Sequence, residues 1–131
     1  MEQITTVGID LAKNVSSLHG VDGAGRGVLR RTVRREQLVA TMAAMPPCLI
    51  GMKACSGAHE WGRRFQGFGH TVRLMAPRFV APYRKSGKND SNDAEAICEA
   101  MTRPNMRFVP VKIANAIVLT PQRMDLDALR K

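Results

Sequence analysis

The sequence predicts an α/β fold in which helices cover both faces of one mixed β-sheet. Two observations carry this prediction. Three strand-like segments separated by turns occupy the first 33 residues, and helix-like and strand-like segments then alternate. The length of 131 residues fits one domain, and 44% hydrophobic residues is an ordinary globular composition.

The first three segments predict an antiparallel meander. Thr, Val and Ile are dense in them, and a glycine-rich turn separates the second from the third. The predicted strands are Ile4–Asp10, Val15–Val21 and Val28–Val33, with the turn at Asp22–Gly27. The turn is not a dinucleotide-binding fingerprint, because Val28 stands where the third glycine is needed and no helix follows.

Helices and strands alternate in the rest of the chain. Glu36–Met45 has a helical apolar stripe that Pro46 and Pro47 end, and Cys48–Met52 is a short apolar run typical of a buried strand. The remaining predicted elements are a helix from an N-cap at Ser56 through Phe68 to Gly69, a strand at Thr71–Met75, a short helix or turn at Pro77–Tyr83, a polar loop at Lys85–Asn89 and a helix at Asp90–Met101.

The chain is strongly basic. It has 20 Lys and Arg against 11 Asp and Glu, a formal net charge of +9 and a pI near 10.3. This favours binding to nucleic-acid phosphates over the alternative of a merely solvated basic surface. Only 5% of the residues are aromatic, so stacking on bases is not the obvious binding mode. The predicted nucleic-acid contacts are Arg30, Arg31, Arg34, Arg35, Arg84, Lys85 and Lys88.

The three cysteines predict free thiols in a reducing compartment. Cys48, Cys55 and Cys98 are an odd number without C-x-x-C spacing. Cys55 and His59 are spaced to share a helix face, but two further zinc ligands are missing, so buried small side chains are the favoured reading. We find no secretory signal and no apolar run long enough for a membrane span, and we expect a bacterial cytoplasmic protein without a membrane partner.

Three aspartates are placed to form a metal site. Asp10 ends the first predicted strand, and Asp90 and Asp93 share one face in the first turn of a helix. Carboxylates in this arrangement can bind Mg²⁺ or Mn²⁺ for phosphodiester transfer. The alternative is that Asp90 and Asp93 only cap the helix, whose positive dipole end favours acidic side chains.

Three motifs give the chain a recognisable pattern. GIDLAKN at residues 8–14, GMKACSGAH at 51–59 and KSGKNDSNDAEA at 85–96 occur in this order. From about Ile4 to Val111 the chain resembles the N-terminal domain of the DEDD transposases of bacterial insertion sequences, which work with a bridge RNA. The resemblance implies a RuvC-like fold of the ribonuclease H superfamily and metal-dependent DNA strand cleavage and exchange. It also implies DNA and a structured guide RNA as partners, homo-oligomers of the full-length proteins, and Asp10, Asp90 and Asp93 as catalytic metal ligands.

The chain departs from the family pattern at its second acidic position. Lys53 stands where the motif has Glu, and an ammonium has no lone pair for a metal. We therefore expect weakened metal binding and little phosphoryl chemistry, and we do not expect Glu60, seven residues later, to substitute.

A second departure concerns the end of the chain. The family-like sequence ends near Val111, and residues 112–131 are expected to be a divergent, partly disordered tail. With no serine in an evident nucleophile arrangement, the expectation is a truncated transposase remnant that is inactive alone. A non-catalytic RNA- or DNA-binding module of the same fold is the alternative. A weaker third reading is a sugar-kinase-like phosphate loop at Gly8–Asp10, which lacks the glycine such loops need after the aspartate.

Overall fold

The computed structural model describes residues 3–55, 57–84 and 90–112. Its centre is a five-stranded sheet in the order β3-β2-β1-β4-β5. The strands are β1 (Ile4–Leu11), β2 (Val15–Asp22), β3 (Gly27–Arg34), β4 (Leu49–Lys53) and β5 (Thr71–Met75). The predicted α/β class with a mixed sheet is confirmed.

The first three strands form the predicted antiparallel meander, and β4 and β5 extend it in parallel. β1 pairs with β2 antiparallel and with β4 parallel, so it is the central strand. Val7 and Ile9 of β1 are fully buried. The parallel register pairs Ile9 with Met52, which places the ends of β1 and β4 side by side at one edge of the sheet.

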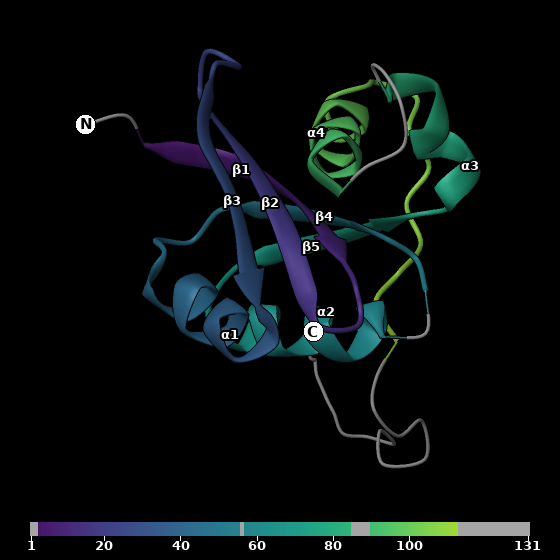
Figure 1. Ribbon diagram of the computed structural model, residues 1–131. Helices are drawn as coiled ribbons and strands as arrows, with labels where there is room; N and C mark the ends of the chain where they lie inside the picture. The colour runs from purple at the N-terminus through teal and green to yellow at the C-terminus, as the bar shows by residue number, and fades with distance from the viewer. Residues whose placement is uncertain (1–2, 56, 85–89, 113–131) are drawn as a thin grey trace, which may run out of the picture.

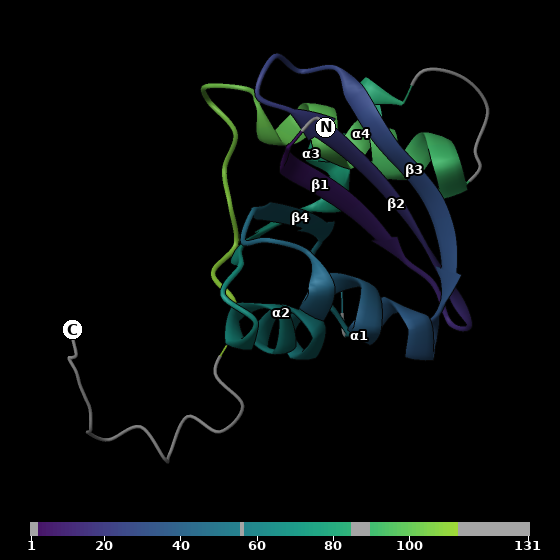
Figure 2. The same cartoon turned by 90° about the vertical axis from the view of Figure 1, so that its left-hand side faces the viewer.

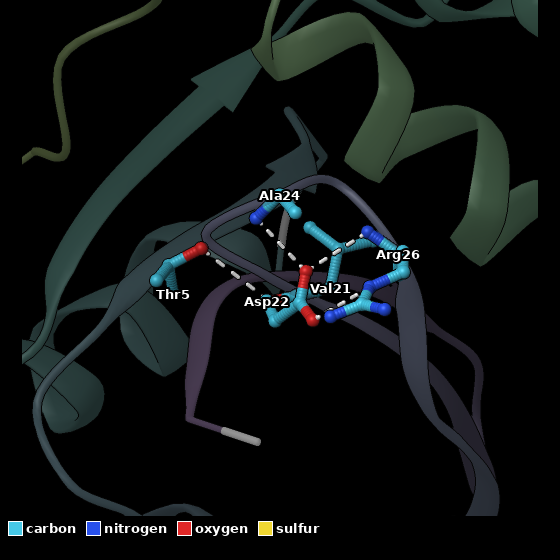
Figure 3. Close-up of polar contacts among 5 residues, drawn as sticks. All are labelled: Thr5, Val21, Asp22, Ala24 and Arg26. Atoms are coloured by element: carbon cyan, nitrogen blue, oxygen red, sulfur yellow. Dashed lines mark hydrogen bonds and ion pairs between the residues drawn. The ribbon is translucent and has the colours of Figure 1, made fainter.

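The turn between β2 and β3 is organised by Asp22, the last residue of β2. Its Oδ1 accepts hydrogen bonds from the backbone N–H groups of Ala24 (2.9 Å) and Arg26 (3.0 Å), and Arg26 also forms an ion pair with it (Figure 3). Gly25 in this turn has φ +84°, which a side chain would disfavour. The aspartate therefore fixes the turn that the glycines make possible.

Helices cover the two faces of the sheet separately (Figures 1 and 2). α1 (Arg35–Ala44) and α2 (Ala58–Gly67) lie on one face, and α4 (Asp90–Met101) lies on the other together with α3 (Pro77–Val80) and the 3₁₀ turn η1 (Ala81–Tyr83). The larger core joins α1 and α2 to the sheet through Leu38, Met42, Trp61 and Phe65.

Two glycines allow α4 to approach the sheet closely. A Cβ on Gly8 would come within 2.4 Å of the Ala94 carbonyl oxygen, and one on Gly51 within 1.9 Å of the Met101 Sδ. The apolar side of α4 predicted from the sequence is confirmed, because Ala94, Ile97, Cys98 and Met101 are all buried.

After α4 the chain returns along the outer edge of the sheet. Val109 pairs with Leu74 of β5, and its N–H donates to the Leu74 carbonyl at 2.7 Å. Farther on, the Lys112 carbonyl accepts from Arg63 of α2. This segment covers the exposed edge of β5, which would otherwise offer unpaired backbone groups.

The N-cap predicted for α2 is wrong. The N-cap of α2 is Gly57, not Ser56, and Ser56 itself lies outside the described residues. Gly69, with φ +97°, closes this helix as predicted. The predicted loop at 85–89 and all but the first residue of the predicted tail at 112–131 also lie outside the described residues.

Candidate metal and nucleic-acid site

The candidate site begins at the carboxyl ends of β1 and β4. Asp10 lies near the end of β1 with only 6% of its surface exposed, and Lys53 is the last residue of β4. Because Ile9 is in register with Met52 in a parallel pair, the next residues along both strands are neighbours. The sheet itself therefore brings Lys53 against Asp10.

α4 supplies the second carboxylate. Asp93 lies in the first turn of this helix and is 7% exposed. Gly8 and Gly51, which face α4, hold this helix against the sheet at the same edge. The aspartates of β1 and α4, remote in the sequence, thus lie beside one lysine.

Two cations neutralise the two buried carboxylates. Lys53 Nζ lies 3.4 Å from Asp10 Oδ1 and 3.9 Å from Asp93 Oδ2. Arg84, which directly follows η1, donates from Nε to Asp93 Oδ1 at 2.7 Å. The formal charges of this cluster cancel, which satisfies the requirement that nearly buried charges be paired.

A small cavity of about 230 Å³ adjoins the cluster and is lined by Asp10, Lys53, Cys55 and Pro77 among others. The Lys53 side chain is 27% exposed and the Arg84 side chain 29%, so both cations reach solvent more than the side chains of Asp10 and Asp93, which are 8% and 10% exposed. A ligand in this cavity would therefore meet the ammonium of Lys53 as well as the carboxylate of Asp10.

The donor set fits a divalent cation poorly. Asp10 and Asp93 offer carboxylate oxygens, which Mg²⁺ and Mn²⁺ prefer, but both carboxylates already have a cationic partner, and the Lys53 ammonium would repel a metal. Within the described ranges, no three His, Cys, Asp or Glu side chains are grouped to hold a metal. Asp90 begins α4, but its side chain lies outside the described part, so its part in a metal site stays a prediction.

The residues considered as zinc ligands or as a substitute for the missing glutamate have other contacts. His59 Nδ1 accepts a hydrogen bond from the Lys112 N–H at 2.9 Å, and Cys55 is exposed. Glu60 lies on α2, which covers the opposite face of the sheet, and forms an ion pair with Arg64 at 3.6 Å. Neither the paired zinc ligands nor a substitute carboxylate is supported by these positions.

The predicted nucleic-acid contacts divide into several groups. Arg30, Arg31 and Arg34 are exposed on β3, where Arg30 reaches Glu95 of α4 at 3.8 Å. The Arg35 guanidinium lies over the Trp61 ring, 5.7 Å from its centre. Lys85 and Lys88 lie outside the described residues.

Arg84 is the residue whose surroundings the sequence did not reveal. The sequence predicts that Arg84 contacts nucleic acid, whereas in the structure its Nε donates to Asp93. No local pattern links an arginine to an aspartate nine residues later when a loop separates them, so only the fold shows the pair.

Comparison with known proteins gives close relatives of this chain. The chain is 52% identical over 111 residues to a probable family 20 transposase of Pseudomonas aeruginosa, covering 85% of this chain and 33% of that protein. It is 43% identical over all 131 residues to the transposase for insertion sequence element IS1111A of Coxiella burnetii, covering 34% of that protein. The chain is homologous to the N-terminal portion of insertion-sequence transposases. No family model matches it.

The fold of this transposase homologue also matches a solved structure. Thermus thermophilus RuvC, solved with a Holliday junction substrate, superimposes with a TM-score of 0.50 at 13% identity, over 75% of this chain and 91% of RuvC. This shows that the fold is RuvC-like, as predicted. The chain spans about a third of the length of the transposases it matches. Within the described part of the transposase homologue, no helix has the length and apolar character needed to cross a membrane.

Proposed function

We propose that this chain is a DNA-binding RuvC-like transposase domain that does not cleave DNA on its own. The observation that carries the proposal is the Lys53 ammonium, held between the buried carboxylates of Asp10 and Asp93. The similarity to transposases and the family resemblance support metal-dependent strand cleavage and exchange in transposition as the ancestral activity of the site. Lys53 removes the second acidic ligand and supplies a fixed cation in its place.

The same cluster explains why we expect weak metal binding. Asp10, Asp90 and Asp93 are the proposed ligands, and Mg²⁺ or Mn²⁺ would supply Lewis-acid stabilisation of a phosphodiester reaction. A metal must compete with Lys53 for both described carboxylates and with Arg84 for Asp93. Among the residues that the structure describes, Asp10 and Asp93 are therefore paired with Lys53 and Arg84 and do not form a preorganised metal cage.

DNA binding is proposed from charge and position. The net charge of +9 gives a favourable interaction with any phosphate backbone through counterion release. Arg31 and Arg34 are exposed on β3 and are the best placed of the predicted contacts, whereas Arg84 already neutralises Asp93. A structured guide RNA and a homo-oligomeric full-length protein are further proposals from the family resemblance.

Fluorescence anisotropy tests this function directly. A labelled DNA duplex and a labelled structured RNA are titrated with the chain across a salt series, with and without EDTA. We expect Kd to rise steeply with salt, no effect of EDTA, and unchanged binding by Asp10→Ala, provided that this variant is folded. A flat salt dependence, or loss of binding in EDTA, would exclude the proposal.

A second candidate function is metal-dependent strand cleavage by this chain itself. It is favoured by the convergence of Asp10 and Asp93 from elements far apart in the sequence. A nicking assay in Mn²⁺ with the chain as it stands and with Lys53→Glu separates the two functions. Nicking by the unmodified chain that disappears in Asp10→Ala would support catalysis, and nicking only after Lys53→Glu would support the binding module.

A further inference from the structure

A second, larger pocket lies away from the carboxylates, between the α3–η1 segment and the chain that follows α4. Its volume is about 730 Å³, within the range of ligand sites. Three arginines and two aromatic residues line it together with smaller side chains, and no acidic residue does: Arg78, Phe79, Tyr83, Arg103 and Arg107. The pocket thus combines positive charge with flat apolar surface.

The positive charge of this pocket is only partly neutralised. Arg103 forms an ion pair with Glu99, one turn earlier on α4. Arg78 and Arg107 are exposed, and among residues 3–55, 57–84 and 90–112 no carboxylate lies within ion-pair distance of either. Two guanidinium groups are therefore available to an anion, and a planar fork of N–H donors suits a phosphate.

The aromatic rings of the pocket already carry stacked cations. The Arg78 guanidinium lies 4.7 Å from the centre of the Phe79 ring, and that of Arg103 lies 5.1 Å from the centre of the Tyr83 ring. Tyr83 also packs against the core formed with α4, which holds its ring in place. Nucleic-acid bases stack on aromatic rings and on arginine planes alike.

We propose that this pocket binds an unpaired nucleotide of single-stranded DNA. The base stacks against the Tyr83–Arg103 pair, and the phosphates contact Arg78 and Arg107. A base in a duplex is stacked and paired inside the helix and does not reach such a pocket, so the pocket selects single strands. The choice of DNA rests on the proposed function.

The pocket is linked to the carboxylate cluster through consecutive residues. Tyr83 lines the pocket, and Arg84, the next residue, donates to Asp93. A strand seated in the pocket is therefore bound by the same short segment that neutralises Asp93. This gives the proposed DNA-binding domain a specific surface for a displaced strand, in addition to the exposed arginines of β3.

Anisotropy with a labelled oligothymidylate tests this pocket, since this probe has no secondary structure. We expect Tyr83→Leu to raise Kd about tenfold through loss of stacking, while Tyr83→Phe, which keeps the ring, restores binding to within about twofold. Arg107→Ala is expected to weaken binding and to reduce the slope of log Kd against log salt by about 0.7, the value for one single-strand phosphate contact.

Arg64→Ala is the matched control. It removes the same charge from α2, on the opposite face of the sheet, and is expected to change oligothymidylate binding less than Arg107→Ala. Thermal melting of each variant identifies any that fail to fold, and Arg107→Ala keeps the test open if Tyr83→Leu does not fold.

The outcomes separate this proposal from the proposed function. If the unmodified chain binds DNA and neither Tyr83→Leu nor Arg107→Ala weakens oligothymidylate binding beyond Arg64→Ala, the pocket assignment is overturned and the proposed function stands. If the unmodified chain binds no DNA, both fail. Tighter binding of oligouridylate with the same dependence on Tyr83 would overturn the assignment to DNA.

Discussion

Lys53 and Arg84 allow two carboxylates to lie almost buried at one place. Asp10 and Asp93 are each less than a tenth exposed, and a buried carboxylate without a cationic or hydrogen-bonding partner is strongly destabilising. Lys53 and Arg84 therefore have a structural role, which is to compensate the charges of Asp10 and Asp93, whether or not the site is catalytic.

Replacing Lys53 by Met tests this structural role. The variant keeps an unbranched side chain but removes the charge 3.4 Å from Asp10 and 3.9 Å from Asp93. Since the lysine is partly solvated, we expect a loss of about 1–2 kcal/mol in the free energy of unfolding. Urea unfolding at neutral pH measures it, with Lys13→Met as an exposed control. Equal stability of the two variants would show that Lys53 does not compensate these carboxylates.

The cysteines give a prediction about pH. Burial raises the pKa of the Cys48 and Cys98 thiols from 9.0 to about 11. Because the unfolded chain releases these protons at lower pH than the folded one, their stabilising effect is complete below about pH 9 and is lost as the pH rises through about 11.

Urea unfolding at pH 8 and at pH 10.5 measures this effect. We expect stability to fall between the two values, and to fall less in Cys98→Ala than in Cys55→Ala, whose missing thiol is exposed. An identical drop in both variants would exclude the contribution of the buried thiol.

Among the elements, α4 approaches the sheet closely because two of the sheet residues that face it, Gly8 and Gly51, have no side chain. A Cβ on Gly8 would lie 2.4 Å from the Ala94 oxygen and 2.6 Å from the Cys98 nitrogen, both backbone atoms that cannot rotate away. At Gly51 the obstacle is the Met101 side chain, whose sulfur can move. The two glycines therefore differ in how a substitution is accommodated.

We expect Gly8→Ala to lower the free energy of unfolding by at least about 2 kcal/mol, more than Gly51→Ala. Shortening Met101 should relieve the clash only at Gly51, so Gly51→Ala and Met101→Ala should couple favourably by about 1 kcal/mol in a double-mutant cycle. Equal coupling of Met101→Ala with Gly8→Ala would contradict this packing.

The order and type of the elements could be predicted from the sequence because the signals are local. β-branched residues mark β1, and the apolar spacing of α4 gives its buried side as observed. The start of α2 could not be predicted, because Ser56 and Gly57 are both acceptable N-caps and tertiary packing chooses between them.

The candidate site could be predicted only in part, because some of its contacts join segments that no local sequence pattern connects. Asp10, Lys53 and Asp93 were identified through motifs, and the structure shows them together. The Arg84–Asp93 pair and the pocket at Tyr83 depend on contacts between segments separated by a loop or a helix, which carry no local signature. The low aromatic content of the sequence gave no sign of this pocket, because the proposed stacking position needs only one tyrosine.

At the scale of the whole molecule, the chain combines an RuvC-like fold, a strong positive charge and a neutralised carboxylate cluster. The chain spans about a third of the length of the transposases it matches. Under the proposed function, the positive charge binds the domain to nucleic acid, and Lys53 separates that binding from metal-dependent chemistry.

Calorimetric titration of Mn²⁺ into the unmodified chain and into Lys53→Glu measures whether Lys53 disables the metal site. We predict that Lys53→Glu binds Mn²⁺ at least about tenfold more tightly, since it replaces a competing ammonium with an oxygen ligand, and that adding Asp10→Ala removes the gain. Equal affinity of the unmodified chain and Lys53→Glu would contradict the claim that this lysine disables the metal site.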